Sequence, residues 1–211
     1  MTEKFLLLGA ASQISHYLIP DLLTQTDVQL TLFARNANDR LKKYADKAGI
    51  IDGNWDNYSE LASVLKDQDI VYLATVPSMV TSQKIVKAMK QNGVKRLIVA
   101  GGLGIFDEVV GKFGQWNAQM IGDYSAIKEA SFALCDQDLD VTFLRMTWLY
   151  DQNNNTDYEI VPEGEPYKGT QVTRQAVAQL ITDIVKNPLL YSHQNIGVVE
   201  PDTEWDKPSF Y

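Results

Sequence analysis

Residues 4–35 read KFLLLGAASQISHYLIPDLLTQTDVQLTLFAR, and this stretch decides the fold. The apolar run at 5–8 predicts a buried strand, and the small residues at 9–12 predict a tight turn. Residues 13–26 predict a helix, and a second apolar run at 28–33 predicts the next strand. A strand, a small-residue turn and a helix in this order are typical of a dinucleotide-binding sheet.

The alternation of apolar strands and amphipathic helices continues along the chain. Further strands are predicted at residues 49–51, 69–76, 94–102, 140–150 and 195–200. Further helical segments are predicted at residues 36–49, 57–65, 78–93, 122–137 and 172–187. Because strands that alternate with helices form parallel sheets covered on both faces, the sequence predicts an α/β fold. We expect a doubly wound, Rossmann-like parallel sheet with helices on both faces.

Two segments lie outside this alternation. Residues 103–122 are expected to form a long aromatic loop, and loops of that length are more often functional than idle. Residues 151–170 are polar and rich in turn residues, so a short hairpin is expected there.

The chain length of 211 residues favours one NAD(P)-binding domain, residues 1–211. Residues 151–211 then form a small C-terminal, substrate-side portion that is not an independent domain.

Composition restricts the partners and the compartment. The net charge of −8 makes nucleic acid and anionic membranes poor partners. No apolar run approaches ~18 residues, so no membrane span is expected. The single cysteine, Cys135, cannot form an internal disulfide, which suits the cytoplasm. His16 and His193 have no further ligand at metal-binding spacing, so no metal site is expected.

The sequence GAASQIS at residues 9–15 is the candidate phosphate-binding turn. Gly9 permits a tight turn, and Ser15 is small enough for close packing of helix on strand. Ser12 stands where a second glycine is usual, so its side chain crowds a pyrophosphate, although its hydroxyl could bond a phosphate oxygen. The free N–H groups at the helix start favour an anion. The alternative is a plain tight turn.

Arg35 ends the second predicted strand, where an acidic residue would bind an adenosine ribose. An arginine at that position suits a 2′-phosphate instead, so the sequence predicts a preference for NADP(H) over NAD(H). Arg40 is placed to assist from the following helical segment. The alternative is a solvated arginine at the end of a strand.

Tyr124 and Lys128 form a Y-x-x-x-K pair at the start of the helix predicted at residues 122–137. Residues i and i+4 lie on one face of a helix. An ammonium group beside a phenol would lower the pKa of Tyr124 and make it a better proton donor to a carbonyl. The alternative is an ordinary pair on the surface of a helix.

Aromatic side chains are candidates for the wall of an apolar substrate pocket. They are Trp148 and, in the expected loop, Phe106, Phe113 and Trp116. The alternative is that they cover a sheet edge or a subunit contact. The aromatic residues within 204–211, EWDKPSFY, leave a similar choice between a docking segment and the contact of a homodimer.

Together these motifs resemble the short-chain dehydrogenase/reductases, and most closely their atypical, NmrA-like NAD(P)-binding branch. The resemblance rests on the phosphate turn, on Arg35, on the Tyr124–Lys128 pair and on LRMTWLY at residues 144–150. It covers most of the chain, residues 1–190. Members of this branch have a doubly wound parallel sheet and bind NADP(H) or NAD(H). Some of them reduce substrates, and others only sense the cofactor.

The resemblance implies a role for individual residues. It implies that Tyr124 is the proton donor, and that Lys128 binds the nicotinamide ribose and tunes Tyr124. The implied cofactor-binding residues are Gly9, Ser12, Gln13 and Ile14 at the pyrophosphate with Ala11 in the same turn, Arg35 at the 2′-phosphate, Asn54 and Trp55 near the adenine, Ala74 and Thr75 near the ribose, and Lys128, Met146, Thr147 and Trp148 at the nicotinamide end.

The chain departs from the pattern of that branch at the end of the strand predicted at residues 94–102. Active members usually hold a serine there that positions the substrate carbonyl, whereas this chain has Gly101 and Gly102. A carbonyl that is not polarised loses transition-state stabilisation. The candidates for a replacement hydroxyl are Thr75, Ser78 and Ser125.

The leading expectation is an NADP(H)-binding oxidoreductase that reduces a small carbonyl or quinone-like acceptor. One alternative is a non-catalytic regulator that senses NADP(H) and acts through a protein partner. Another is a scaffold that binds no dinucleotide because Ser12 blocks the turn.

Overall fold

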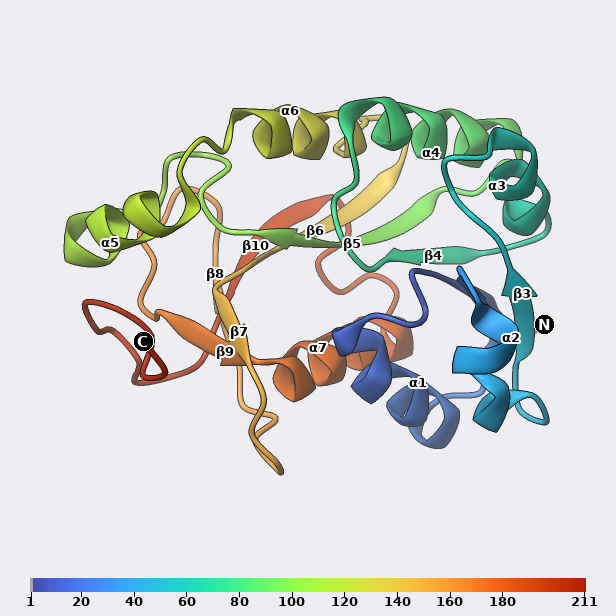
Figure 1. The fold of residues 1–211 in the computed structure, drawn as a ribbon, viewed down its shortest axis with the longest axis horizontal. Helices are drawn as coiled ribbons and strands as arrows, with labels where there is room; N and C mark the ends of the chain where they lie inside the picture. Colours follow the sequence, from blue (N-terminus) through green and yellow to red (C-terminus); the bar gives the residue numbers. More distant parts are fainter. Residues whose placement is uncertain (1) are drawn as a thin grey trace.

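The computed structural model describes residues 2–211, whose main sheet has eight strands (Figure 1). The bounds of these strands are β1 Lys4–Leu8, β2 Gln29–Ala34, β3 Gly49–Asp52, β4 Ile70–Leu73, β5 Arg96–Gly102, β6 Asp140–Met146, β8 Glu159–Val161 and β10 Gln194–Val199. Their spatial order is β3-β2-β1-β4-β5-β6-β10-β8. Neighbouring strands are parallel except for β8, which runs antiparallel to β10. The predicted Rossmann-like α/β fold is confirmed.

Helices cover both faces of the sheet (Figure 1). One face carries α1 (Gln13–Gln25) and α7 (Arg174–Lys186), and the other carries α3 (Tyr58–Leu65), α4 (Met79–Gln91) and α6 (Ser125–Leu134). The side chains of β1 alternate between these layers. Its residues 5 and 7 belong to the core under α1 and α7, and its residues 6 and 8 belong to the core under the other helices. Burial on both faces explains why β1 is a continuous apolar run.

The strand order reverses beside β1, and this reversal positions the site. The chain places β2 and β3 on one side of β1, and β4, β5 and β6 on the other. β1 and β4 are in register, with Leu8 opposite Leu73. In doubly wound sheets, ligands bind beyond the C-terminal ends of the strands at such a reversal. The residues that follow Leu8 and Leu73 therefore border the candidate site.

The prediction of an unbroken loop at residues 103–122 is wrong, because this segment contains the helix α5 (Gly111–Ile121). Glycine is a poor helix former, and Gly111 and Gly114 conceal the helix in the sequence. Gly114 is required by packing, since a Cβ built there would lie 2.4 Å from the carbonyl oxygen of Val109. The segment 36–49 is also less helical than expected, with α2 (Ala37–Arg40) and one 3-10 turn at Lys42–Tyr44.

The strand predicted at residues 140–150 is interrupted at Thr147, whose N–H donates to the carbonyl oxygen of Val198 at 3.1 Å. Its second part is β7 (Trp148–Tyr150), which pairs with β9 (Gln171–Thr173) in a separate two-stranded sheet. The hairpin expected at residues 151–170 is wrong, because β8 pairs with β10 instead.

The segment 151–211 shares the cores of the preceding chain. β10 lies beside β6 in the main sheet, and buried residues of α7 share a core with those of α1. We therefore propose that this segment does not fold as an independent domain. Between residues 2 and 211, no helix combines the length and the apolar character needed to cross a membrane.

Candidate functional site

Gly9 forms the turn after β1 and brings the ends of β1 and β4 close together. Its φ of +89° lies in the left-handed region that favours glycine. A Cβ built at Gly9 would lie 2.9 Å from the Cβ of Ala74 and 3.3 Å from the ring of Trp55. The N–H of Gly9 donates to the carbonyl oxygen of Phe33 at 3.0 Å. The space between the ends of β1 and β4 is therefore open only because residue 9 has no side chain.

Ser12 is the N-cap of α1, and its hydroxyl is engaged inside the turn. Ser12 Oγ accepts a hydrogen bond from the N–H of Ser15 at 3.2 Å and donates to Ser15 Oγ at 2.9 Å. A bond from this hydroxyl to a phosphate would compete with the cap. The N–H groups of Gln13 and Ile14, in the first helical turn, have no acceptor within the helix. These groups and the helix dipole favour an anion at the start of α1.

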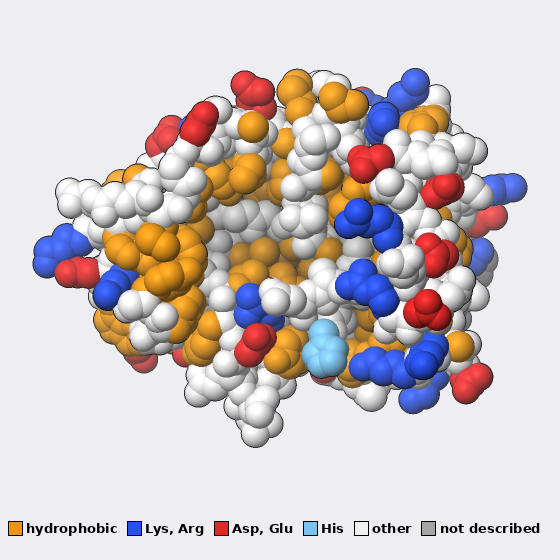
Figure 2. Space-filling view, viewed as in Figure 1, with side chains coloured by type: hydrophobic (Ala, Val, Ile, Leu, Met, Phe, Trp, Pro, Cys, Tyr) orange, Lys and Arg blue, Asp and Glu red, His pale blue; other side chains and the backbone are white. Residues whose placement is uncertain are grey.

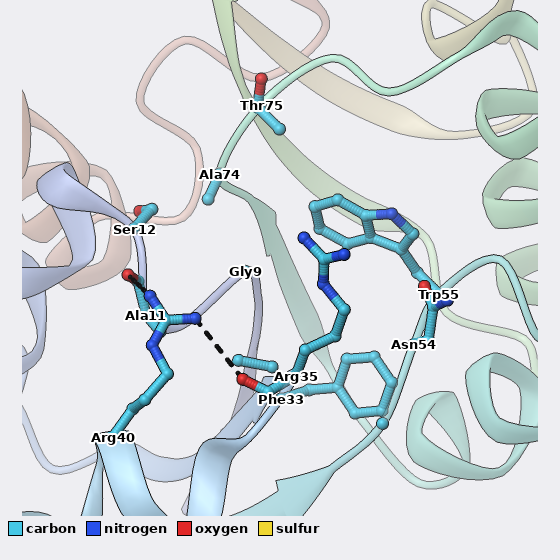
Figure 3. A pocket seen from close by; sticks show the side chains of 12 residues that line it. Gly9, Ala11, Ser12, Phe33, Arg35, Arg40, Asn54, Trp55, Ala74 and Thr75 are labelled. Atoms are coloured by element: carbon cyan, nitrogen blue, oxygen red, sulfur yellow. Dashed lines mark hydrogen bonds between the residues drawn. The ribbon is translucent and has the colours of Figure 1, made fainter.

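A pocket of about 210 Å³, here called the turn pocket, opens beyond β1, β2 and β4 (Figure 3). Its lining residues are Gly9, Ala11, Ser12, Phe33, Ala34, Arg35, Arg40, Gly53, Asn54, Trp55, Ala74 and Thr75. Most of the predicted cofactor-binding residues are therefore brought together here. The segment that follows β3 closes the pocket opposite the turn, and it contributes Asn54 and Trp55.

Two arginines border the turn pocket, and their contacts differ. Arg40 Nη2 donates to the carbonyl oxygen of Ala11 at 2.9 Å, and Arg40 Nη1 donates to that of Arg35 at 3.4 Å (Figure 3). Arg40 thus ties the turn to the end of β2. The guanidinium of Arg35 forms no hydrogen bond or ion pair with the part of the chain described, and it points toward the indole of Trp55. Arg35 is therefore the cation available to a phosphate.

The turn pocket adjoins a second cavity of about 550 Å³, here called the inner cleft, because both are lined by Ala74 and Thr75. The other lining residues of the inner cleft are Ile14, Val76, Ala100, Gly101, Gly102, Leu103, Ile121, Tyr124, Ile127, Met146, Thr147, Trp148, Leu149, Arg174, Phe210 and Tyr211. Figure 2 shows a hollow near the centre of this face, with hydrophobic side chains inside it and Lys or Arg side chains on its right-hand rim. A groove that is cationic at one end and apolar at the other suits a dinucleotide.

The structure brings most of the predicted site residues to the two cavities. The predicted cofactor-binding and catalytic residues line the turn pocket or the inner cleft, except for Gln13, which is exposed at the start of α1, and Lys128. Of the aromatic residues predicted to wall a substrate pocket, Trp148 lines the inner cleft, whereas Phe106, Phe113 and Trp116 line neither cavity. Sequence reasoning missed Arg174, Phe210 and Tyr211 as residues of the inner cleft. No local pattern indicates them, because long-range packing brings them to this edge of the sheet.

Tyr124 places its hydroxyl against the end of β5 in the inner cleft. A Cβ built at Gly102 would lie 2.6 Å from the hydroxyl oxygen of Tyr124. Burial raises the pKa of Tyr124, and the carboxylate of Glu108 raises this pKa further. The expected lowering of its pKa is therefore wrong. The raised pKa makes this phenol a weaker acid than the sequence led us to expect, and the phenol stays protonated at neutral pH.

Lys128 does not pair with Tyr124 as the spacing suggested. Its Nζ forms an ion pair with Asp107 Oδ2 at 2.8 Å, and Lys128 does not line either cavity. Tyr124 is the N-cap of α6, with φ −106° and ψ 2°, so it precedes the helical part of the backbone. The rule that i and i+4 share a face holds only inside a helix.

The end of β5 has no room for the serine that active members of the branch usually carry. A Cβ built at Gly101 would lie 2.1 Å from the ring of Phe143, and one at Gly102 would meet the Tyr124 hydroxyl. Among the candidates for a replacement hydroxyl, Thr75 lines both cavities, whereas Ser78 is the N-cap of α4.

A buried ion pair fixes the loop that follows β5. Arg145 Nη1 and Glu108 Oε1 are 2.9 Å apart, and the two side chains are 0% and 5% exposed. The Glu108 carboxylate also accepts hydrogen bonds from the N–H groups of Gly104 and Phe106, each at 2.9 Å. This loop therefore holds a negative charge near Tyr124, which explains the added rise in the pKa of Tyr124.

The comparisons with known proteins agree with this geometry. A family model described as NAD(P)H-binding matches residues 9–188. A short-chain dehydrogenase/reductase (wide type) from Veillonella parvula DSM 2008, solved in complex with NADP, is 32% identical, with a TM-score of 0.94 and 100% of each chain covered. A Rossmann-fold NAD(P)-binding family protein from Shigella flexneri is 34% identical, with a TM-score of 0.83 and 100% of each chain covered.

A more distant structure shares the fold. ChuY, an anaerobillin reductase from Escherichia coli O157:H7, is 19% identical, with a TM-score of 0.76 over 98% of this chain and 100% of that chain. No curated protein matches the sequence. The family match spans most of the chain, and the crevice at the β1–β4 reversal lies where such proteins bind nicotinamide cofactors. The chain therefore belongs to the NAD(P)H-binding family of atypical short-chain dehydrogenase/reductases.

Proposed function

We propose that this protein is a cytoplasmic, NADP(H)-dependent oxidoreductase that reduces a small carbonyl or quinone-like acceptor. The observation that carries the proposal is the position of the Tyr124 hydroxyl. This hydroxyl lies in the apolar inner cleft, which adjoins the turn pocket at Ala74 and Thr75. The NADP complex of the Veillonella parvula relative supports the choice of cofactor.

The residues of the turn pocket fit a dinucleotide that carries a 2′-phosphate. Gly9 leaves the crevice open, and the N–H groups of Gln13 and Ile14 would hold the pyrophosphate. The unpaired guanidinium of Arg35 would hold the 2′-phosphate. The remaining proposed contacts are Ala11 and Ser12 in the turn, Asn54 and Trp55 at the adenine, Ala74 and Thr75 at the ribose, and Met146 and Thr147 at the nicotinamide.

The proposed chemistry is a two-electron reduction. NADPH, when bound, supplies a hydride and becomes NADP⁺. Tyr124 donates its phenolic proton to the acceptor oxygen, so a carbonyl gains a hydride and a proton and becomes an alcohol. A quinone becomes a hydroquinone in the same way, and Tyr124 regains its proton from water. The hydroxyl of Thr75 would donate a hydrogen bond to the acceptor oxygen. Lys128 would bind the nicotinamide ribose after its ion pair with Asp107 breaks.

The reaction is tested by measuring NADPH oxidation with a panel of benzoquinones, naphthoquinones and aldehydes. We expect turnover with at least one of these classes, since the inner cleft is apolar and holds a protonated phenol. Assays without protein and with NADH in place of NADPH are the controls. Saturable NADPH binding without turnover of any acceptor would contradict the reductase function.

Replacing Arg35 with Gln tests the cofactor preference. We expect NADPH binding to weaken by about 10- to 100-fold, because a charge-assisted contact to a phosphate contributes about 1.5–3 kcal/mol. NADH binding should change by less than about twofold, since NADH has no 2′-phosphate. Arg40→Gln is the matched control: it removes the bonds to the carbonyl oxygens of Ala11 and Arg35 and should weaken both cofactors equally. An equal loss for both cofactors in Arg35→Gln would argue against the 2′-phosphate contact.

The second candidate function is a regulator that binds NADP(H) without chemistry and acts through a protein partner. Two observations favour it: the end of β5 lacks a hydroxyl at Gly101 and Gly102, and Lys128 is paired with Asp107. The retained Tyr124 hydroxyl in the inner cleft favours the reductase. The acceptor panel above separates the two functions.

A further inference from the structure

The inner cleft has an aromatic wall that three distant parts of the chain build. The wall is formed by Trp116 of α5, Trp148 of β7 and Tyr211, whose ring centroids are 4.9, 5.1 and 5.2 Å apart. Trp148 is fixed further, because its Nε1 donates to Asn117 Oδ1 at 2.9 Å. Trp148 and Tyr211 line the cleft, and the ring of Trp116 packs against both of them. The cleft therefore has an aromatic wall against which a flat ligand could pack.

Arg174 supplies the one charged side chain among the described residues that line the inner cleft. Its side chain is only 15% exposed. Arg174 Nη1 lies 3.2 Å from Asp151 Oδ2, and the side chain of Asp151 is 56% exposed. Arg174 Nε is buried and has no hydrogen-bond partner within residues 2–211. Asp151 is shared, because it also accepts a hydrogen bond from the Tyr17 hydroxyl at 3.3 Å.

Arg145 shows how an arginine with a purely structural role is satisfied in this chain. Its Nε donates to Asn195 Oδ1 at 2.6 Å, its Nη1 donates to Glu108 Oε1 at 2.9 Å, and its Nη2 donates to two backbone carbonyl oxygens. A buried donor without a partner lowers the stability of the folded protein. The unpartnered Nε does not by itself distinguish Arg174, because Arg96 Nε is also buried without a partner within residues 2–211. Arg174 differs from Arg145 and Arg96 because it lies at the edge of an otherwise uncharged cleft and has one exposed ion-pair partner. This arrangement is suited to an anionic group of a ligand.

We propose that the acceptor is a flat aromatic molecule that carries an acidic substituent. Its ring lies against Trp148 and Tyr211, and its carboxylate or sulfonate pairs with Arg174. The proposal rests on the proposed reductase function, because it names the acceptor class of the same site. The redox step is unchanged: the acceptor gains the hydride of NADPH and one proton, and its acidic group takes no part.

The proposal is tested with a naphthoquinone and the same naphthoquinone bearing a sulfonate. The unmodified protein should show a KM about 10-fold lower for the sulfonated compound, because a charge-assisted pair adds about 1.5 kcal/mol or more. Arg174→Gln should remove this difference, so that the KM values of the two quinones come within about twofold of each other. Tyr211→Leu should raise the KM of both quinones, because it removes part of the wall that they share. Lys112→Gln is the charge control, since Lys112 is 77% exposed and lies outside the inner cleft.

Calorimetric binding of both quinones in the presence of NADP⁺ separates this proposal from the reductase function. Binding that favours the sulfonated quinone and depends on Arg174, without turnover, would contradict the reductase and support the anion contact. Equal affinity for the two quinones in the unmodified protein would overturn the proposal. If Arg174→Gln does not fold, the unmodified protein still gives a test: binding of the sulfonated quinone alone should weaken as salt rises to about 0.5 M. A loss that is equal for both quinones would contradict the anion contact.

Discussion

Replacing Tyr124 with Phe is expected to lower kcat by about 10²- to 10⁴-fold, which is the usual contribution of a positioned proton donor. The substitution keeps the aromatic ring and removes only the hydroxyl that faces Gly102. NADPH affinity should stay within about twofold, because Tyr124 does not line the turn pocket. The measurement is steady-state NADPH oxidation with the best acceptor of the panel, together with a separate NADPH titration.

Tyr158→Phe is the matched control for Tyr124→Phe. The Tyr158 hydroxyl donates to Asp183 Oδ2 at 2.8 Å and does not line the inner cleft. This control also loses one phenol hydroxyl, together with its hydrogen bond to Asp183, yet kcat should be unchanged. A Tyr124→Phe variant that retains kcat within about threefold would remove Tyr124 from the mechanism, since proton donors contribute far more than that.

Replacing Gly9 with Ala is expected to block cofactor binding. The new Cβ would lie 2.9 Å from the Cβ of Ala74 and 3.3 Å from the ring of Trp55, and both residues line the turn pocket. We expect the Kd for NADPH to rise by at least about 10-fold, or about 1.4 kcal/mol, because the new Cβ displaces Ala74 and Trp55 from the positions in which they line the pocket. The free energy of unfolding should fall by a similar amount, measured by urea unfolding without cofactor.

Gly93→Ala separates backbone strain from loss of the pocket. Gly93 has a φ of +72°, and a Cβ built there meets no atom within 4 Å. It should therefore lose stability through strain alone and bind NADPH normally. If Gly9→Ala also bound NADPH normally, the crevice beyond β1 would not be the cofactor site.

Most of the main sheet follows from local patterns in the sequence. The apolar run at residues 5–8 is buried on both faces, so its strand shows no alternation and is easy to recognise. Most of the residues that line the turn pocket were predictable too, because they follow strand ends and the strand order brings those ends together. α5 was not predictable, since Gly111 and Gly114 disfavour a helix that tertiary contacts nevertheless stabilise.

Two features of the inner cleft depend on geometry that the sequence does not carry. The spacing of Tyr124 and Lys128 predicts a pair only if both residues are helical, and Tyr124 is the N-cap instead. Arg174 is the first residue of α7, directly after β9, and Tyr211 is the last described residue. Both line the inner cleft although they are far in sequence from the phosphate turn. Long-range packing of this kind leaves no periodic signal in the local sequence.

The central claim is that NADP(H) binds across the β1–β4 reversal, and a fluorescence titration of the unmodified protein tests it most directly. Trp55 lines the turn pocket, so bound NADPH should change the tryptophan emission. The account predicts saturable binding of NADPH in the micromolar range and weaker binding of NADH. An absence of saturable NADPH binding at millimolar concentrations would contradict it.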